Sequence, residues 1–258
     1  MTVDFSQNAH VYDDRHGTHI DAALAGKLVR ALGVAEGARV LDAAAGTGRV
    51  AVPLTQAGLT MIGLDLARPM LQQLRAKANG GPCNVLQGDT MHLPFSAASF
   101  DAVVFARLLY LLPAWRDFLD EAVRVARRPV RLAHEWGNGT AAEPWAQVRD
   151  WARALFEAEG VTQPFHPGVR SEADVEAYLA QAHGLRPAAC IAQVSRVEMT
   201  LGAFIDRLER GVCSYIWNVP EPVQARCLPR LRARAEAQFD LDAPMRLPAE
   251  ERWVVYAQ

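Results

Sequence analysis

The first half of the chain alternates between short apolar runs and amphipathic stretches. Runs of consecutive apolar residues are typical of strands buried on both faces of a sheet, whereas apolar residues spaced three and four apart are typical of helices. The runs predict five strands, at 38–42, 60–64, 83–87, 100–105 and 130–135. Helices are predicted before and between them, at 20–32, 49–56, 69–79 and 113–123.

The second half is less regular but contains the same two patterns. Helical spacing predicts helices at 145–156, 171–183, 201–208 and 222–239, and strands are predicted at 188–199 and 252–257. Together the two halves predict an α/β fold with a doubly wound, mostly parallel seven-stranded sheet. In such a sheet the C-terminal ends of the parallel strands meet at one edge, where ligands bind.

Three regions are expected from this order of elements. Residues 1–35 form an irregular N-terminal arm followed by a helix, in which Thr18 and Asp21 resemble a capping box. Residues 36–136 form the Rossmann-like core. Residues 137–258 supply the remaining helices and strands, with a helical segment at about 200–250.

Composition narrows the class of protein. Half of the 258 residues are hydrophobic and the net charge is −2, so neither nucleic acid nor an anionic membrane is an expected partner. No apolar run reaches the roughly 18 residues that span a bilayer, and a cytoplasmic protein is expected. The four cysteines are far apart, which favours reduced thiols and indicates no metal site. The sequence makes no prediction of oligomeric state.

The segment 40–50 predicts a strand, a tight glycine turn and the start of a helix. Gly46 and Gly48 can adopt backbone angles that are closed to residues with a Cβ, and they allow a ligand to approach the main chain. The free N–H groups of the following helix suit an anionic or carboxylate-bearing ligand.

Three acidic residues stand at the ends of three successive predicted strands: Asp42, Asp65 and Asp89. Asp65 lies nineteen residues beyond Gly46, where a carboxylate accepts hydrogen bonds from ribose hydroxyls in dinucleotide or adenosyl ligands. At Asp89 a carboxylate can accept from the exocyclic amine of adenine. Leu66 and Met91 can pack on the faces of that base.

Four segments in order resemble a known family. LDAAAGTGR, IGLDLARPML, NVLQGDTMHLPF and SFDAVVFARLLYLLP are similar to the motifs of class I S-adenosylmethionine-dependent methyltransferases. The nearest branch is the small-molecule (type 11) group that includes quinone-biosynthesis methyltransferases. The resemblance spans about residues 36–136 and implies S-adenosylmethionine as cofactor. It also implies methyl transfer to a small-molecule acceptor by in-line displacement.

The resemblance also implies a role for each matching residue. Asp42 would reach the amino end of the cofactor, Asp65 the ribose and Asp89 the adenine amine. The methionine part would be bordered by Gly46, Gly48, Ala106 and Arg107, and the adenine ring by the backbone of Thr90 and Met91. Tyr12 and Arg15 resemble an N-terminal arm that folds over the cofactor in relatives.

The chain departs from the family pattern in three places. Arg127-Arg128-Pro129 replaces a Lys-Pro-Gly-Gly type of turn, and neither Tyr110 nor Leu111 is the histidine that many relatives have there. The segment at about 200–250 is long and helical where most relatives have a tight hairpin. We therefore expect this segment to be a substrate cap.

On the substrate side, His134 and Glu135 end the fifth strand and together could accept a proton from a hydroxyl or amine. The alternative is a structural hydrogen-bonded pair. Tyr110 is either a substrate contact or a core residue whose hydroxyl is satisfied. A base is needed only if the methyl acceptor must lose a proton, and no metal is required.

Two other functions stay open at the level of sequence. The motif of NAD-binding oxidoreductases has a third glycine in the turn, at the position that Ala51 occupies here. That function would also give no role to Gly88 and Asp89. A non-catalytic S-adenosylmethionine-binding protein would keep the same crevice. The acceptor, and the atom that receives the methyl group, are not predicted.

Overall fold

The computed structural model describes residues 5–6, 9–79, 81, 83–138, 144–162, 167–169, 171–213 and 216–258; within these ranges, the side chains of 15–16, 137–138, 194–197 and 246–250 are not described. The chain divides into two compact units. The sheet unit comprises residues 4–137, 168–193 and 252–258, and the helical unit comprises 1–3, 138–167 and 194–251.

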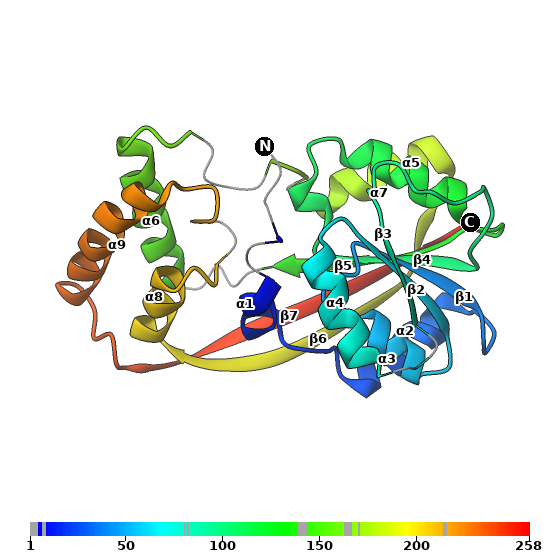
Figure 1. Cartoon of the computed structure of the whole chain (residues 1–258), viewed down its shortest axis with the longest axis horizontal. Helices are drawn as coiled ribbons and strands as arrows, with labels where there is room; N and C mark the ends of the chain where they lie inside the picture. The colour runs from blue at the N-terminus through cyan, green and yellow to red at the C-terminus, as the bar shows by residue number, and fades with distance from the viewer. Residues whose placement is uncertain are drawn as a thin grey trace. The chain divides into compact units, whose positions relative to one another are not determined.

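A seven-stranded sheet has the strand order β3-β2-β1-β4-β5-β7-β6 (Figure 1). The strands β1 to β5 pair as parallel neighbours, so their C-terminal ends share one edge. This arrangement confirms the predicted doubly wound sheet. The bounds are β1 (Arg39–Ala43), β2 (Thr60–Asp65), β3 (Cys83–Gln87), β4 (Ala102–Ala106), β5 (Arg131–Asn138), β6 (Arg186–Thr200) and β7 (Pro244–Ala257).

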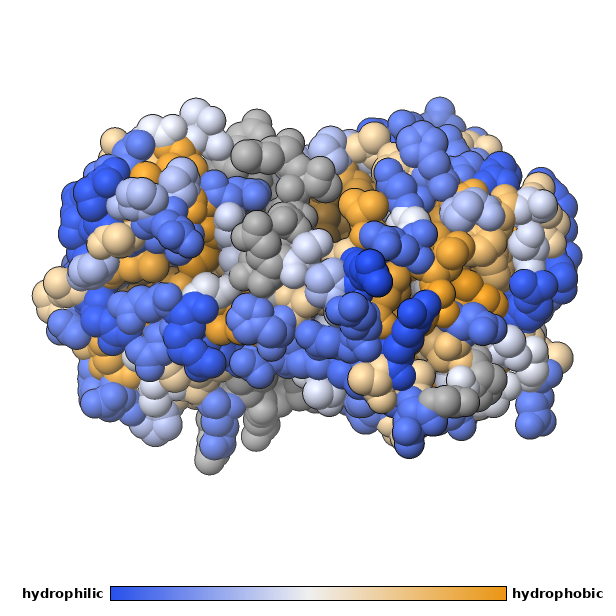
Figure 2. Space-filling view, viewed as in Figure 1, coloured by the Kyte–Doolittle hydropathy of each residue, from blue (hydrophilic) through white to orange (hydrophobic). Residues whose placement is uncertain are grey.

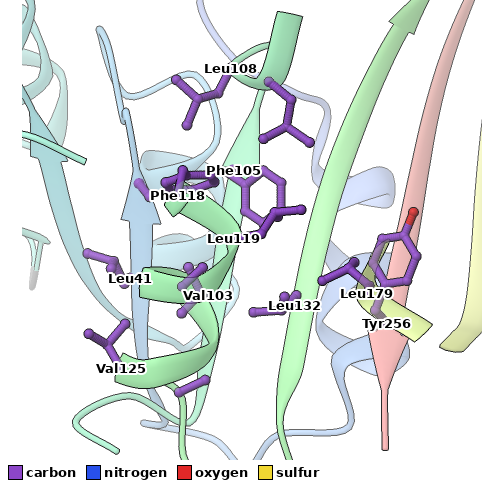
Figure 3. Packing of buried hydrophobic residues seen from close by; sticks show 14 of the residues in the cluster. Leu41, Val103, Phe105, Leu108, Phe118, Leu119, Val125, Leu132, Leu179 and Tyr256 are labelled. Atoms are coloured by element: carbon purple, nitrogen blue, oxygen red, sulfur yellow. The ribbon is translucent and has the colours of Figure 1, made fainter. Parts of the chain in front are cut away.

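Helices cover both faces of the sheet. On one face, α5 (Trp115–Val125) and α7 (Glu172–His183) bury the apolar cluster drawn in Figure 3, in which Phe105 of β4 meets Phe118 edge-to-face. The opposite face packs against α2 (Ala22–Leu32), α3 (Ala51–Gln56) and α4 (Arg68–Ala78). Burial on both faces explains why the strands are continuous apolar runs rather than alternating ones.

The helical unit has its own core. It contains α6 (Trp145–Ala158), α8 (Leu201–Glu209) and α9 (Glu221–Glu236), whose apolar stripes form one buried cluster. Ion pairs on its surface join α8 and α9, since Arg232 of α9 contacts Asp206 and Glu209. The unit includes residues 138–167 and is therefore larger than the expected segment at 200–250. The long strands β6 and β7 contribute residues to both units.

The N-terminal region differs from its prediction. Residues Ala9–His16 form the helix α1, where an irregular arm is expected. The cap of α2 is also different, because Asp21 itself is the N-cap and its Oδ1 accepts from the Leu24 N–H at 2.7 Å. Thr18 has no part in that bond. A capping carboxylate satisfies one of the free N–H groups of the first turn, which makes Asp21 an adequate cap by itself.

Two expectations about the whole chain can be compared with the described residues. No helix among them is both long enough and apolar enough to cross a bilayer. The four cysteines are all free thiols, as expected from their spacing.

Candidate functional site

The three aspartates lie along the C-terminal edge of the sheet. In the parallel register, Asp42 of β1 is opposite Gly63 of β2, and Asp65 at the end of β2 is opposite Gln87 of β3. Asp89 follows β3 by two residues. The carboxylates therefore follow three neighbouring strands in order, and Asp42 and Asp65 are close enough to repel one another.

Asp42 is buried, with 2% of its surface exposed, and accepts a hydrogen bond from the Ala51 N–H. Burial, followed by repulsion from Asp65, raises the pKa of Asp42 to about 7. The first N–H of α3 is thus taken by a side chain of the protein. The N–H of Ala51 is therefore not available to a ligand carboxylate, and the expectation that the turn and helix start receive one stays a prediction.

Asp65 joins the glycine turn to the start of α4. Its Oδ2 accepts from the Gly46 N–H at 2.8 Å, and its Oδ1 accepts from the Ala67 N–H at 2.8 Å. Burial raises its pKa above the ordinary value. The Leu66 N–H is a third backbone donor to this carboxylate, and because a carboxylate offers about four acceptor positions, capacity for a ligand remains.

The two glycines of the turn lie against different parts of the protein. Gly46 has a φ of +53°, and a Cβ there would stand 3.8 Å from the Tyr12 ring, which lies over the turn. Gly48 has a φ of +86°, and a Cβ there would stand 2.8 Å from Leu74 of α4. Gly48 therefore allows the turn to pack against α4, and its place beside a ligand stays a prediction.

The loop after β3 forms an apolar corner beside a carboxylate. Asp89 Oδ1 accepts from the Met91 N–H at 2.9 Å, while its side chain stays half exposed. Thr90 is buried and Met91 packs on the core of the sheet unit. Leu66 is 61% exposed, and Figure 2 shows apolar residues reaching the surface where β2 and β3 lie. An exposed leucine beside two carboxylates suits a flat base with polar edges.

A clamp from α5 fixes this loop. Arg124 donates from Nη1 to the Phe95 carbonyl at 2.7 Å and from Nη2 to the Leu93 carbonyl at 3.0 Å. Glu121 accepts from the Leu93 N–H at 2.9 Å and also pairs with Arg124. The position of the loop is therefore set by a helix that lies outside the strand-end motifs.

Helix α1 is docked on the same edge. Asp13 accepts from the Thr47 hydroxyl at 2.6 Å and pairs with Lys77 of α4. Tyr12 lies among Tyr110, Arg107, Arg49 and Glu135, and burial raises the pKa of its hydroxyl. Tyr12 lies over the glycine turn, and its predicted role over a cofactor stays a prediction. The Arg15 side chain is outside the described residues.

Glu135 is held by two guanidinium groups. Its Oε1 lies 2.6 Å from Arg49 Nη2 and 3.2 Å from Arg107 Nε, and only 1% of the residue is exposed. This carboxylate is thus the shared counter-charge of two arginines. Sequence reasoning missed Arg49, because nothing in the segment around it indicates a partner 86 positions away.

His134 points to the other face of the sheet, because neighbouring strand residues alternate. It stacks on Phe105 at 4.9 Å between ring centroids, and burial lowers its pKa to about 3. Trp136 contacts the imidazole ring of His134 edge-to-face. The expectation that His134 and Glu135 accept one proton together is wrong, since they lie on opposite faces.

The segment after β4 carries the remaining predicted residues. Ala106 packs on the core of the sheet unit and Arg107 follows it with a φ of +53°. Tyr110 lies in the 3₁₀ turn η1 (Leu109–Leu111), whose carbonyls accept from the N–H groups of Gly168 and Val169. A Cβ at Gly168 would stand 2.0 Å from the Leu109 carbonyl oxygen. This backbone clamp is invisible at the level of sequence because its partners are nearly sixty residues apart.

The amino-acid sequence of residues 41–133, which contains this edge of the sheet, matches the family model of a methyltransferase domain. This part of the chain is a methyltransferase domain. The match ends just before His134 and covers β1 to β4 with the start of β5. The methyltransferase domain therefore contains the glycine turn, the three aspartates and Arg107.

Two relatives named as methyltransferases are similar to less than half of this chain. The chain is 34% identical over 125 residues to a fatty-acid O-methyltransferase of Mycolicibacterium smegmatis, covering 48% of this chain and 44% of that protein. It is 37% identical over 100 residues to a demethylmenaquinone methyltransferase of Renibacterium salmoninarum, covering 39% and 41%. The chain thus spans about two fifths of the length of these curated relatives.

A solved structure shares the fold. Phosphoethanolamine N-methyltransferase 2 of Haemonchus contortus, in complex with S-adenosyl-L-methionine, superposes with a TM-score of 0.54 at 14% identity. The match covers 98% of this chain and 57% of that one. At this identity the likeness concerns the fold, which is that of Rossmann-like methyltransferases.

Proposed function

We propose that this chain is an S-adenosylmethionine-dependent methyltransferase that acts on a small-molecule acceptor. The observation that carries the proposal is the row of Asp42, Asp65 and Asp89 along one strand edge of a methyltransferase domain. When bound, S-adenosylmethionine supplies a methyl group already activated by its sulfonium charge. The task of the protein is then to hold the cofactor and acceptor in line.

The residues present fit this cofactor. Asp42 is a buried carboxyl with a raised pKa, and the ammonium of a methionine moiety would be a matching partner. Asp65 keeps acceptor positions for ribose hydroxyls. Leu66, Met91 and the half-exposed Asp89 offer an apolar surface and an acceptor for adenine.

Tyr12 covers the glycine turn, and Tyr110 and Ala106 border the same edge. In this proposal, they exclude water around the reacting methyl group, with Arg15 of α1 completing the arm. The helical unit would supply the substrate cap. We assign no proton acceptor, since Glu135 is paired with arginines and His134 is a weak base on the other face.

Calorimetry with S-adenosylhomocysteine, S-adenosylmethionine and NAD tests the proposal. We expect saturable binding of the adenosyl ligands and none of NAD; the reverse result would favour the oxidoreductase. Asp65→Ala should weaken S-adenosylhomocysteine at least about tenfold, because charged hydrogen bonds to the ribose are lost. Asp150→Ala, an exposed aspartate of α6, is the matched control and should leave the affinity unchanged. Equal losses in the two variants would overturn the ribose assignment.

Methyl transfer itself needs a separate assay. Incubation with S-adenosylmethionine carrying a labelled methyl group and a panel of carboxylic acids, phenols and amines should transfer label to one class. Tight cofactor binding with no transfer to any class would instead favour a non-catalytic binding protein.

A further inference from the structure

Helix α6 of the helical unit carries an arginine that the described residues leave without a partner. Arg149 is half-buried, and its Nε is enclosed with no hydrogen-bond partner. No ion pair or ring contact joins its guanidinium to the described residues either. Asp150 is next in sequence, but successive side chains of a helix point about 100° apart, so the two do not face each other.

The other arginines of this unit's helices are different. Each of those on α6, α8 and α9 has a hydrogen-bonding, ring or electrostatic partner: Arg153, Arg207, Arg226, Arg230, Arg232 and Arg234. Among the described residues of these three helices, Arg149 is therefore the cation that is left for an anion from outside the chain.

One turn before Arg149, the indole of Trp145 is unsatisfied as well. Its Nε1 is enclosed and has no hydrogen-bond partner among the described residues. Its ring stacks on Phe204 of α8, with centroids 5.1 Å apart and planes 7° apart, which fixes the orientation of the indole. Residues four apart share a face of a helix, so the two unpaired donors are neighbours on α6.

The chemistry of the two groups indicates the missing partner. A guanidinium and an indole N–H donate hydrogen bonds and accept none, so the partner must be an acceptor. Enclosed donors without an acceptor lower the stability of a fold. A single guanidinium matches a monoanion, and its planar fork fits the two oxygens of a carboxylate. The stacked rings of Trp145 and Phe204 add apolar surface beside this charge.

We propose that Arg149 and the Trp145 indole bind the carboxylate of an apolar acid, and that Phe204 contacts the apolar body of that acid. Because this acid is taken to be the methyl acceptor, the inference rests on the proposed function and narrows the acceptor to the carboxylic acids. All three residues belong to the helical unit, so specificity for the acceptor is determined outside the methyltransferase domain.

Calorimetry with two matched pairs of probes tests this inference. The pairs are decanoate with decan-1-ol and 2-naphthoate with 2-naphthol, titrated at neutral pH into the full chain saturated with S-adenosylhomocysteine. The wild-type protein should bind the acid of at least one pair about tenfold or more tightly than its alcohol. The reason is that only the acid makes charged hydrogen bonds to Arg149.

Three variants separate the contributions to that preference. Arg149→Met should weaken the acid about tenfold or more and leave the alcohol unchanged, and Arg149→Lys should retain part of the preference because it keeps the charge without the planar fork. Trp145→Phe keeps a ring against Phe204 but removes the N–H, and should weaken the acid about two- to tenfold.

The matched control is Arg230→Met. Arg230 is an exposed arginine of α9 that pairs with Glu159, and its loss should leave both affinities unchanged. Thermal melts of all variants without ligand should stay near the wild-type temperature, because neither Arg149 nor the Trp145 N–H has a hydrogen bond to lose among the described residues.

Three results overturn the inference. One is a wild-type protein that prefers neither acid to its alcohol. Another is an equal loss of acid and alcohol in Arg149→Met, which would mean that this arginine only supports the helical unit. The third is the same loss of acid in Arg230→Met, which would mean unspecific attraction between charges. Failure of the proposed function is distinguishable, since the wild-type protein would then not bind S-adenosylhomocysteine in the first titration.

Discussion

At the scale of single residues, the site is a set of carboxylates whose environments differ. Asp42 is buried beside other acids, Asp65 is bonded to three backbone N–H groups, and Asp89 is half exposed. The sequence predicts that all three reach one edge, because parallel strands end together. It does not predict these differences, which depend on what packs around each carboxylate.

A pH prediction follows from Asp42. Its pKa is about 7 in the folded protein and 3.8 ordinarily, so the folded state favours the protonated form. The stability contributed by this group is present below pH 4 and is lost as the pH rises towards 7. Asp42→Asn should therefore raise the free energy of unfolding at about pH 8, by on the order of 2 kcal/mol.

Urea denaturation without ligand at about pH 4 and pH 8 measures this effect. The gain should vanish at the lower pH, where both proteins carry an uncharged side chain. A gain of the same size at both values would mean that packing, rather than charge, is responsible. The same variant should bind S-adenosylhomocysteine more weakly, because the ammonium loses its partner.

Ala44 gives a second prediction at this scale. Its φ is +63°, in the region that favours glycine, and it follows β1 just before the glycine turn. Ala44→Gly should stabilise the protein by about 0.5–1 kcal/mol, because relief of strain exceeds the entropy cost of glycine. Ala31→Gly, in the last turn of α2, is the control and should destabilise the protein in the same thermal melts, by up to about 1 kcal/mol.

At the scale of elements, local patterns were sufficient for most of the sheet. The strands β1 to β6 and the helices α2 to α9 appear near their predicted positions, since apolar periodicity and flanking glycines or prolines determine them. The last strand, β7, begins at Pro244, well before the predicted start at Arg252. Helix α1 is missed because it has no apolar stripe along its sequence. Its docking depends on Asp13, whose partners Thr47 and Lys77 are on other elements.

The arginine–glutamate cluster is missed for the same physical reason. Arg49 and Arg107 follow β1 and β4, Glu135 lies in β5, and their meeting depends on the order of strands in the sheet. From the sequence, Arg49 is a charged residue after a glycine turn, and such a residue is usually solvated. Only the fold shows that it is buried.

Gly168 gives a prediction about an element. A Cβ there would lie 2.0 Å from the Leu109 carbonyl oxygen, so Gly168→Ala must displace the turn η1. The expected cost is about 1–3 kcal/mol, with weaker binding of S-adenosylhomocysteine as Tyr110 moves. The matched variant is Gly26→Ala in α2, where a Cβ meets only the end of Arg30 at 3.4 Å. It should stabilise by about 1 kcal/mol. Equal changes in melting temperature for the two variants would contradict the role of the backbone hydrogen bonds between η1 and Gly168.

At the scale of the whole molecule, every proposed cofactor contact belongs to the sheet unit. Cofactor binding should therefore protect one unit more than the other. In hydrogen exchange, S-adenosylhomocysteine should slow the amides of α1, the glycine turn and the loop after β3, while α6, α8 and α9 change little. Equal protection of both units would show that the helical unit also responds to the cofactor.

The clamp at Arg124 has a consequence for how base preference can be changed. One guanidinium holds the carbonyls of Leu93 and Phe95, and so closes the loop that begins at Asp89. A lysine has a single ammonium group and lacks the planar fork that reaches both carbonyls. In the proposed site this loop meets the base, so a substitution at Arg124 would change base selectivity by moving the loop, and libraries aimed at cofactor analogues should include α5.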